Sequence, residues 1–330
     1  MDQVEDESVD LVITSPPYPM IEMWDGIFSL QNPAIINALE NKQGNVAYEL
    51  MHNELDKVWK EVYRVLKNGA FACINIGDAT RKIGTEFKSY PNHSRILDSC
   101  LDIGFDALPE ILWRKLTNAP NKFMGSGMLP AGAYVTLEHE FVLILRKGHR
   151  QEFKSNEEKL RRLQSAFFWE ERNTWFSDIW EDLRGTRQNN ISAKIRERSG
   201  AYPFELPYRI INMFSLKEGT VLDPFLGTGT STAAAMASGR NSIGFEIDPN
   251  FKELLSERFS DLIDFSNEFI KTRLQNHVRF IIDSKRELRY TNKKYGFFVV
   301  TKQETEIVFN KLDKLIAKPD NVFEVTYSKD

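Results

Sequence analysis

Residues 220–231 read Thr-Val-Leu-Asp-Pro-Phe-Leu-Gly-Thr-Gly-Thr-Ser and lead into the alanine-rich run Thr232–Ala237. A short apolar strand, a Gly-x-Gly turn and a helix, in this order, let backbone N–H groups approach a nucleotide-like cofactor closely. The third glycine of the dinucleotide fingerprint is absent, because residue 232 is Thr, and no Gly-Lys-Ser/Thr follows to form a phosphate-binding loop. The stretch therefore predicts an α/β fold whose cofactor-binding turn is neither a dinucleotide fingerprint nor a phosphate-binding loop.

A second apolar strand, Ser242–Phe245, follows this helix and ends at Glu246. In sites built from a strand, a turn and a helix, an acidic residue about 20 positions beyond the turn accepts hydrogen bonds from ribose hydroxyls. Glu246 has this spacing, so we predict that it binds the ribose of a cofactor. The alternative is a solvated acid at the end of a strand.

Near the other end of the chain, Thr14–Tyr18 reads Thr-Ser-Pro-Pro-Tyr, directly after the apolar run Val9–Ile13. Two prolines end a strand abruptly, because proline fixes φ and has no N–H to donate. They place a hydroxyl, carbonyl groups and an aromatic ring at the carboxyl end of the strand, where open α/β sheets bind ligands. These groups suit a flat molecule that carries an amine. For five isolated residues, a proline-rich surface turn is the alternative.

Taken together, Thr14–Tyr18 and Asp223–Ser231 resemble the β class of DNA amino-methyltransferases, which methylate an exocyclic amine of a base with S-adenosylmethionine. In that class a Ser/Asp-Pro-Pro-Tyr segment precedes an Asp-x-Phe-x-Gly-x-Gly segment, as it does here. The resemblance covers residues 9–147 and 198–262. It implies a Rossmann-like S-adenosylmethionine-dependent methyltransferase fold with circularly permuted motif order and a mostly parallel sheet. A helical insert and an α+β C-terminal extension would be added to this α/β core.

The resemblance also assigns the residues of the site. A base inside a duplex must be extruded before its amine can react. Tyr18 would stack on that base, while the Ser15 hydroxyl and the Pro16 carbonyl accept hydrogen bonds from the amine, and no covalent nucleophile is needed. The expected catalytic residues are Ser15, Pro16, Pro17 and Tyr18. The expected cofactor-binding residues are Asp223, Pro224, Phe225, Gly227, Gly229, Thr230, Glu246, Tyr202 and Pro203. Arg198 stands where the family often has His.

The residue at position 15 bears on which base is methylated. Members of the class with Ser there mostly methylate N4 of cytosine, whereas Asp or Asn accompanies N6-adenine methylation. We therefore expect a cytosine-N4 enzyme, with N6-adenine methylation as the alternative. Two other readings stay open: a methyltransferase of the same fold that acts on RNA or protein, and a truncated, non-catalytic DNA-binding form.

The chain divides into four predicted parts. They are a catalytic half (1–147), an insert that is the candidate target-recognition region (148–198), a cofactor-binding half (199–262) and a C-terminal extension (263–330) that contacts DNA or completes the sheet. In the insert we expect a helix over Glu157–Trp169. In the extension we expect strands over Val278–Ile282, Phe297–Thr301 and Phe323–Tyr327, and a helix over Glu304–Lys314.

The start of the sequence adds a further expectation. The family usually has a strand and a helix before the segment that corresponds to Asp6–Val12, but here the sequence starts only four residues before Glu5. A sheet without that strand would expose an unpaired edge or a gap beside the catalytic strand. Either the start codon is placed too late, or the C-terminal region supplies the strand, with Val278–Ile282 as the candidate.

The charge balance is not that of a typical nucleic-acid binder. The chain has 330 residues, a net charge of −4 and a pI near 5.9, where a basic footprint is expected. Positive charge instead gathers in residues 140–200 and 266–330, where it forms either a solvated face or phosphate contacts. It is densest at Lys271, Arg273, Arg279, Lys285, Arg286, Arg289, Lys293 and Lys294. The tryptophans Trp169, Trp175 and Trp180 lie among arginines and form either core or DNA contacts.

Composition and resemblance together indicate the cellular compartment and the partners of the protein. Two cysteines make neither a disulfide framework nor a zinc site, and Cys73 is expected in the core. No apolar run is long enough for a membrane span, and the acidic N-terminus is unlike a signal peptide. We expect a cytoplasmic protein whose partner is double-stranded DNA. The resemblance also implies a cognate restriction endonuclease, linked in function only, and is compatible with a homodimer.

Overall fold

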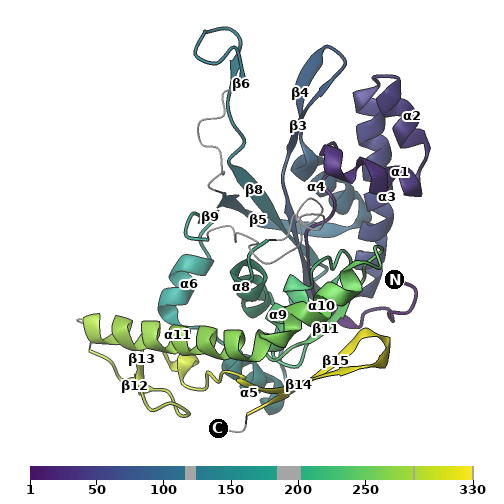
Figure 1. The fold of residues 1–330 in the computed structure, drawn as a ribbon. Coiled ribbons are helices and arrows are strands. Elements are labelled where there is room, and N and C mark those ends of the chain that lie inside the picture. Colours follow the sequence, from purple (N-terminus) through teal and green to yellow (C-terminus); the bar gives the residue numbers. More distant parts are fainter. Residues whose placement is uncertain (116–123, 184–201, 285–286, 329–330) are drawn as a thin grey trace.

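A seven-stranded sheet forms the centre of the computed structural model, which describes residues 1–115, 124–183, 202–284 and 287–328 (Figure 1). The strand order is β11-β10-β1-β2-β8-β5-β9. The strands are β1 (Val9–Thr14), β2 (Leu66–Ile76), β5 (Phe105–Arg114), β8 (His139–Lys147), β9 (Ile179–Trp180), β10 (Thr220–Asp223) and β11 (Asn241–Gly244). Only β8 runs against the others. The predicted α/β fold with a mostly parallel sheet is confirmed.

Helices cover both faces of the sheet, so its strands are apolar on both sides. On β1, Val9 and Val12 pack with one cluster of helices, whereas Leu11 and Ile13 pack with the other. The first cluster contains α1 (Asp25–Gln31), α2 (Ala34–Glu40), α3 (Gly44–Val65) and α4 (Asn92–Ile103). The second contains α8 (Glu205–Phe214), α9 (Thr230–Ala237) and α10 (Phe251–Ser260). Cys73 is fully buried in the second cluster, as expected.

Strand β1, which leads into Thr14–Tyr18, is central and has neighbours on both sides. Leu11 pairs with Val221 of β10 and with Phe71 of β2, both in parallel register. The expected gap beside the catalytic strand is therefore wrong. The sheet begins instead at β11, so the edge on that side lies two strands away from β1.

The insert and the extension correct two sequence predictions. The helix expected over Glu157–Trp169 is two helices, α5 (Asn156–Gln164) and α6 (Trp169–Trp175), because Ser165 ends the first. The strand expected over Val278–Ile282 is wrong, since these residues continue α11 (Leu262–Asp283). The buried positions of α11 recur at helical spacing, which favours a helix. This spacing outweighs the β-branched residues of the last turn, which favour a strand. The buried positions are Leu262, Ser266, Ile270, Arg273 and His277.

The C-terminal segment forms two small hairpins and short 3-10 turns. Strands β12 (Tyr290–Thr291) and β13 (Phe298–Val299) form one hairpin, and β14 (Leu312–Lys318) and β15 (Val322–Tyr327) the other. The strands expected over Phe297–Thr301 and Phe323–Tyr327 are confirmed, the first in shortened form. The helix expected over Glu304–Lys314 is wrong. The 3-10 turn η2 (Lys302–Glu304) ends there, residues 305–311 form neither helix nor strand, and the residues from Leu312 onward belong to β14, which pairs with β15.

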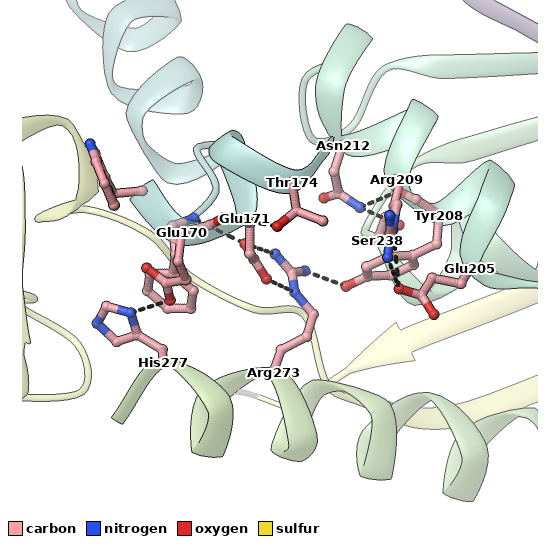
Figure 2. Close-up of polar contacts among 12 residues, drawn as sticks. Glu170, Glu171, Thr174, Glu205, Tyr208, Arg209, Asn212, Ser238, Arg273 and His277 are labelled. Carbon is pink, nitrogen blue, oxygen red and sulfur yellow. Dashed lines mark hydrogen bonds and ion pairs between the residues drawn. The ribbon is translucent and has the colours of Figure 1, made fainter. Parts of the chain in front are cut away.

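Buried ion pairs join the extension to the insert (Figure 2). Arg273 of α11 donates two hydrogen bonds of 2.7 Å to Glu171 of α6 and one of 2.6 Å to the hydroxyl of Tyr208 on α8. One turn further along α11, His277 donates to Glu170 at 2.7 Å. Arg273 is only 8% exposed, so it is unavailable for the phosphate contact considered above. Trp175 and Trp180 are also buried, which confirms the core interpretation for both, whereas Trp169 is partly exposed.

Two hairpins extend beyond the carboxyl edge of the parallel strands (Figure 1). The first, β3 (Ala79–Ile83) with β4 (Glu86–Tyr90), follows the end of β2, and the second, β6 (Met124–Gly125) with β7 (Ala133–Tyr134), lies between β5 and β8. This edge is the one where α/β sheets bind ligands. Two further 3-10 turns are η1 (Glu22–Trp24) and η3 (Pro319–Asn321). Among the described residues, no helix has the length and apolar character that crossing a membrane requires.

Candidate active site

The two sequence motifs meet at the ends of neighbouring strands. Because β1 and β10 are paired in parallel, their last residues lie at the same edge. There the hydroxyl of Thr14 donates a hydrogen bond of 2.6 Å to Oδ1 of Asp223, a residue 209 positions away. Both side chains are buried. The structure therefore brings Thr14–Tyr18 and Asp223–Ser231 together, as their pairing in the sequence predicted.

Asp223 organises the turn that follows it. Its Oδ1 also accepts the backbone N–H of Phe225 at 3.1 Å, and its Oδ2 accepts the hydroxyl of Ser231. The hydroxyl of Tyr202 lies 2.5 Å from that of Ser231 and extends the cluster. Burial raises the pKa of the Asp223 carboxyl, against the lowering by hydrogen bonds from Ser231 and Thr14. With 2% of its surface exposed, Asp223 directs both oxygens to the chain's own donors.

The glycine turn lies beside Glu246 and donates a hydrogen bond to it. The N–H of Gly227 donates to Oε2 of Glu246 at 2.7 Å, and the N–H of Asp248 donates to Oε1 at 2.9 Å. Gly227 has φ +51°, and a Cβ placed there would meet nothing closer than 3.9 Å. The space over this turn is thus open, and an exposed carboxylate borders it. Such an arrangement fits a ligand that carries a ribose diol.

The other predicted cofactor residues divide into two groups. Pro224 and Phe225 are partly exposed on the turn, whereas Thr230, Tyr202 and Pro203 are buried behind it. Gly229 also packs inward. It has φ +74°, and a Cβ there would lie 2.5 Å from Leu255. These buried residues support the shape of the turn. Arg198, the departure from the family pattern, lies outside the described residues.

Residues 15–18 place a serine and a tyrosine at the same edge. Ser15, Pro17 and Tyr18 are partly exposed, whereas Pro16 is buried. The Tyr18 ring lies against Gly77, where a Cβ would be only 3.0 Å from it. Any larger side chain at position 77 would displace the ring. Gly77 therefore provides the space that the tyrosine occupies.

Sequence reasoning missed three residues around the Tyr18 hydroxyl. Asn75 donates to that hydroxyl at 2.9 Å, and the hydroxyl donates to Glu140 at 3.0 Å. Lys115 forms an ion pair of 2.5 Å with the other oxygen of Glu140. The signal in the sequence was the position of these residues relative to the strands. Asn75 lies near the end of one strand, Lys115 just after another and Glu140 at the start of a third. Strand order decides which of these meet, and the sequence leaves that order open.

Asp78, which lies just after β2, caps helix α4. Its Oδ1 accepts the backbone N–H of His93 at 3.1 Å, in the first turn of α4, and the His93 ring nitrogen lies 2.8 Å away. The His93 ring stacks on Phe141 with centroids 3.8 Å apart. Asp78 thereby fixes α4 beneath the catalytic edge.

Known proteins share both the sequence and this architecture. The N6/N4 family model of DNA methylases matches residues 9–257. The type II methyltransferase M.MthZI of Methanothermobacter thermautotrophicus is 52% identical over 308 residues, which cover 93% of this chain and 86% of that protein. M.MjaI, a type II methyltransferase of Methanocaldococcus jannaschii, is 50% identical over 286 residues, 82% of this chain and 93% of that protein.

Solved structures give the same result. A DNA modification methylase of Thermus thermophilus, in complex with S-adenosyl-L-methionine, is 31% identical, with a TM-score of 0.60 over 79% of this chain and 90% of that one. The cytosine-N4-specific PvuII DNA methyltransferase is 18% identical, with a TM-score of 0.54 over 82% and 88% of the two chains, and shares the fold. The chain belongs to the N6/N4 family of DNA methylases and is an S-adenosylmethionine-dependent, site-specific DNA methyltransferase of the restriction-modification type.

Proposed function

We propose that this methyltransferase acts on the N4 amine of an extruded cytosine in duplex DNA. The observation that carries the proposal is the serine at position 15, partly exposed at the carboxyl edge of β1 and next to the cofactor turn. In the class that the sequence resembles, serine at this position mostly accompanies cytosine-N4 methylation. A hydroxyl is a weaker acceptor than a carboxylate, which gives this correlation a chemical basis.

In the proposed reaction, residues 15–18 bind and orient the amine. The Ser15 hydroxyl and the Pro16 carbonyl accept hydrogen bonds from it, and the Tyr18 ring stacks on the base. S-adenosylmethionine supplies an electrophilic methyl group on a sulfonium. Fixed acceptors at the amine stabilise the positive charge that develops on nitrogen, which is electrostatic preorganisation. Holding the reacting atoms close adds a positioning contribution.

The cofactor would lie over the turn between Asp223 and Gly229, with its ribose at Glu246. Since both oxygens of Asp223 are engaged by the chain's own donors, we infer that this residue acts by shaping the turn. Tyr202, Ser231 and Thr230 support it from behind. The backbone of Phe225–Gly229 is then the surface that contacts the methionine part of the cofactor.

Recognition of the DNA sequence is proposed to reside in residues 148–198, with a contribution from the extension. The four-part division of the chain, the functional link to a cognate endonuclease and the homodimer remain predictions of the resemblance. The extension carries basic side chains, but several are paired with acids of the same segment, as Lys271 is with Glu268 and Lys293 with Glu306.

Product analysis tests the proposed target. Purified protein is incubated with unmethylated genomic DNA and S-adenosylmethionine that carries a deuterated methyl group, and the DNA is digested to nucleosides for mass spectrometry. We expect labelled N4-methyldeoxycytidine. Labelled N6-methyldeoxyadenosine in its place would contradict the cytosine assignment. Ser15→Ala serves as the matched control and should yield little labelled product.

A further inference from the structure

The hydroxyl of Tyr18 is surrounded by three polar side chains from three strand ends. Ser15 lies 3.2 Å from it, Asn75 2.9 Å and Glu140 3.0 Å. Asn75 is 1% exposed and is the second-to-last residue of β2, and Glu140 is the second residue of the adjacent antiparallel strand β8. The cluster therefore stands at the carboxyl edge of the sheet, directly behind the proposed base-binding residues.

Chemistry fixes the direction of each hydrogen bond in this cluster. An ionised carboxylate only accepts, so Glu140 must receive the single proton of the Tyr18 hydroxyl and one hydrogen of the Asn75 amide. The phenol oxygen can then only accept, from Asn75 and from Ser15. The Ser15 proton thus points toward Tyr18, and its oxygen lone pairs remain available on the other side.

Two observations support this direction. Lys115 forms an ion pair with Oε1 of Glu140, the oxygen that Tyr18 does not use. Burial, followed by the charge of Glu140, raises the pKa of the Tyr18 phenol well above its usual range. The phenol therefore keeps its proton at neutral pH and remains a donor to the carboxylate.

We propose that Glu140 is the terminal acceptor of a relay, Ser15–Tyr18–Glu140, which turns the Ser15 lone pairs toward the target amine and takes up the proton that the amine loses. The inference rests on the proposed function. As the N–C bond forms, the methyl C–S bond of the sulfonium would break, its electron pair would leave with S-adenosylhomocysteine, and the amine nitrogen would become positively charged. Its proton passes to Oγ of Ser15, the Ser15 proton to Oη of Tyr18, and the Tyr18 proton to Oε2 of Glu140. The products are a neutral methylamine and a protonated Glu140, which returns its proton to solvent.

Glu140→Gln is the first test, because glutamine has nearly the same shape but is a far weaker proton acceptor. The single-turnover rate of methyl transfer should fall by about 10²- to 10⁴-fold, the range of a general-base contribution. The affinity for S-adenosylmethionine, measured by calorimetry without DNA, should stay within about twofold, since Glu140 does not contact the cofactor turn. The matched control is Glu138→Gln, a carboxylate paired with Arg114 at 3.4 Å and half exposed, which should retain the wild-type rate.

Variants of Tyr18 and Glu140 separate a relay from a structural role. Tyr18→Phe keeps the ring but removes the relay hydroxyl, and it should lose as much rate as Glu140→Gln. The double variant should be no slower than either single variant, because both break the same relay.

The outcomes distinguish the relay from the function on which it rests. A wild-type enzyme that makes N4-methylcytosine beside a Glu140→Gln variant of unchanged rate would overturn the relay alone. Additive losses in the double variant, or a parallel loss of cofactor affinity, would also overturn it. A wild-type product other than N4-methylcytosine would contradict the proposed function, and the ratio of the wild-type and Glu140→Gln rates for that product would still decide for or against the relay.

Discussion

The Thr14 hydroxyl donates a buried hydrogen bond of 2.6 Å to Asp223 and so joins strand β1 to the glycine turn after β10 across 209 residues of sequence. Thr14→Val keeps the shape of the side chain and removes the donor. Asp223 retains Ser231 and the Phe225 N–H, so we expect the free energy of unfolding to fall by about 1–3 kcal/mol. Urea denaturation measures it. Thr14→Ser keeps the donor and should lose less, and equal losses for the two variants would contradict this role of the hydroxyl.

The two glycines of the turn should respond differently to alanine. Both have positive φ, but a Cβ at Gly227 enters open space whereas one at Gly229 would lie 2.5 Å from Leu255. Gly227→Ala should weaken S-adenosylmethionine binding by at least tenfold with a modest change in melting temperature. Gly229→Ala should lower the melting temperature strongly. Calorimetry and thermal unfolding of both variants decide, and a reversed pattern would count against the cofactor site over Gly227.

Removing one partner of the ion pair between Arg273 and Glu171 should lower the stability of the protein strongly. Arg273→Met leaves Glu171 largely buried without its partner, so the free energy of unfolding should fall by about 3–5 kcal/mol. The double variant Arg273→Met/Glu171→Leu removes both charges and should be more stable than the single variant. Chemical denaturation of the three proteins provides the comparison. A double variant less stable than Arg273→Met would contradict this explanation, because it would show that the unpaired charge of Glu171 is not the cause of the lost stability.

His277 should make stability depend on pH. Burial lowers its pKa, but the hydrogen bond and charge of Glu170 and the Phe298 carbonyl outweigh this, and the pKa lies above the usual 6.5. Because the folded state binds the proton more tightly, this stabilisation is fully present below pH 6.5 and is lost as the pH rises through the folded-state pKa. His277→Gln should flatten this part of the curve of unfolding free energy against pH. An unchanged curve would contradict the assignment.

The sequence predicted the two motifs better than it predicted the extension. Thr14–Tyr18 and Asp223–Ser231 are local signals of strand, turn and helix, and parallel pairing of β1 with β10 brought them together as expected. Val278–Ile282 was misread as a strand because a five-residue window hides the helical spacing that begins at Leu262. Local windows also missed Glu140, whose proximity to Tyr18 depends on β8 pairing with β2, a contact between distant segments.

Separate measurement of cofactor binding and methyl transfer in Tyr18→Ala tests the central claim most directly. The account places Tyr18 at the base and residues 223–229 at the cofactor. Calorimetry should therefore give an affinity for S-adenosylmethionine close to that of the wild type, while single-turnover methyl transfer to DNA falls by at least a hundredfold. Equal losses of cofactor affinity and of transfer rate would contradict the assignment of Thr14–Tyr18 as the methyl-transfer site.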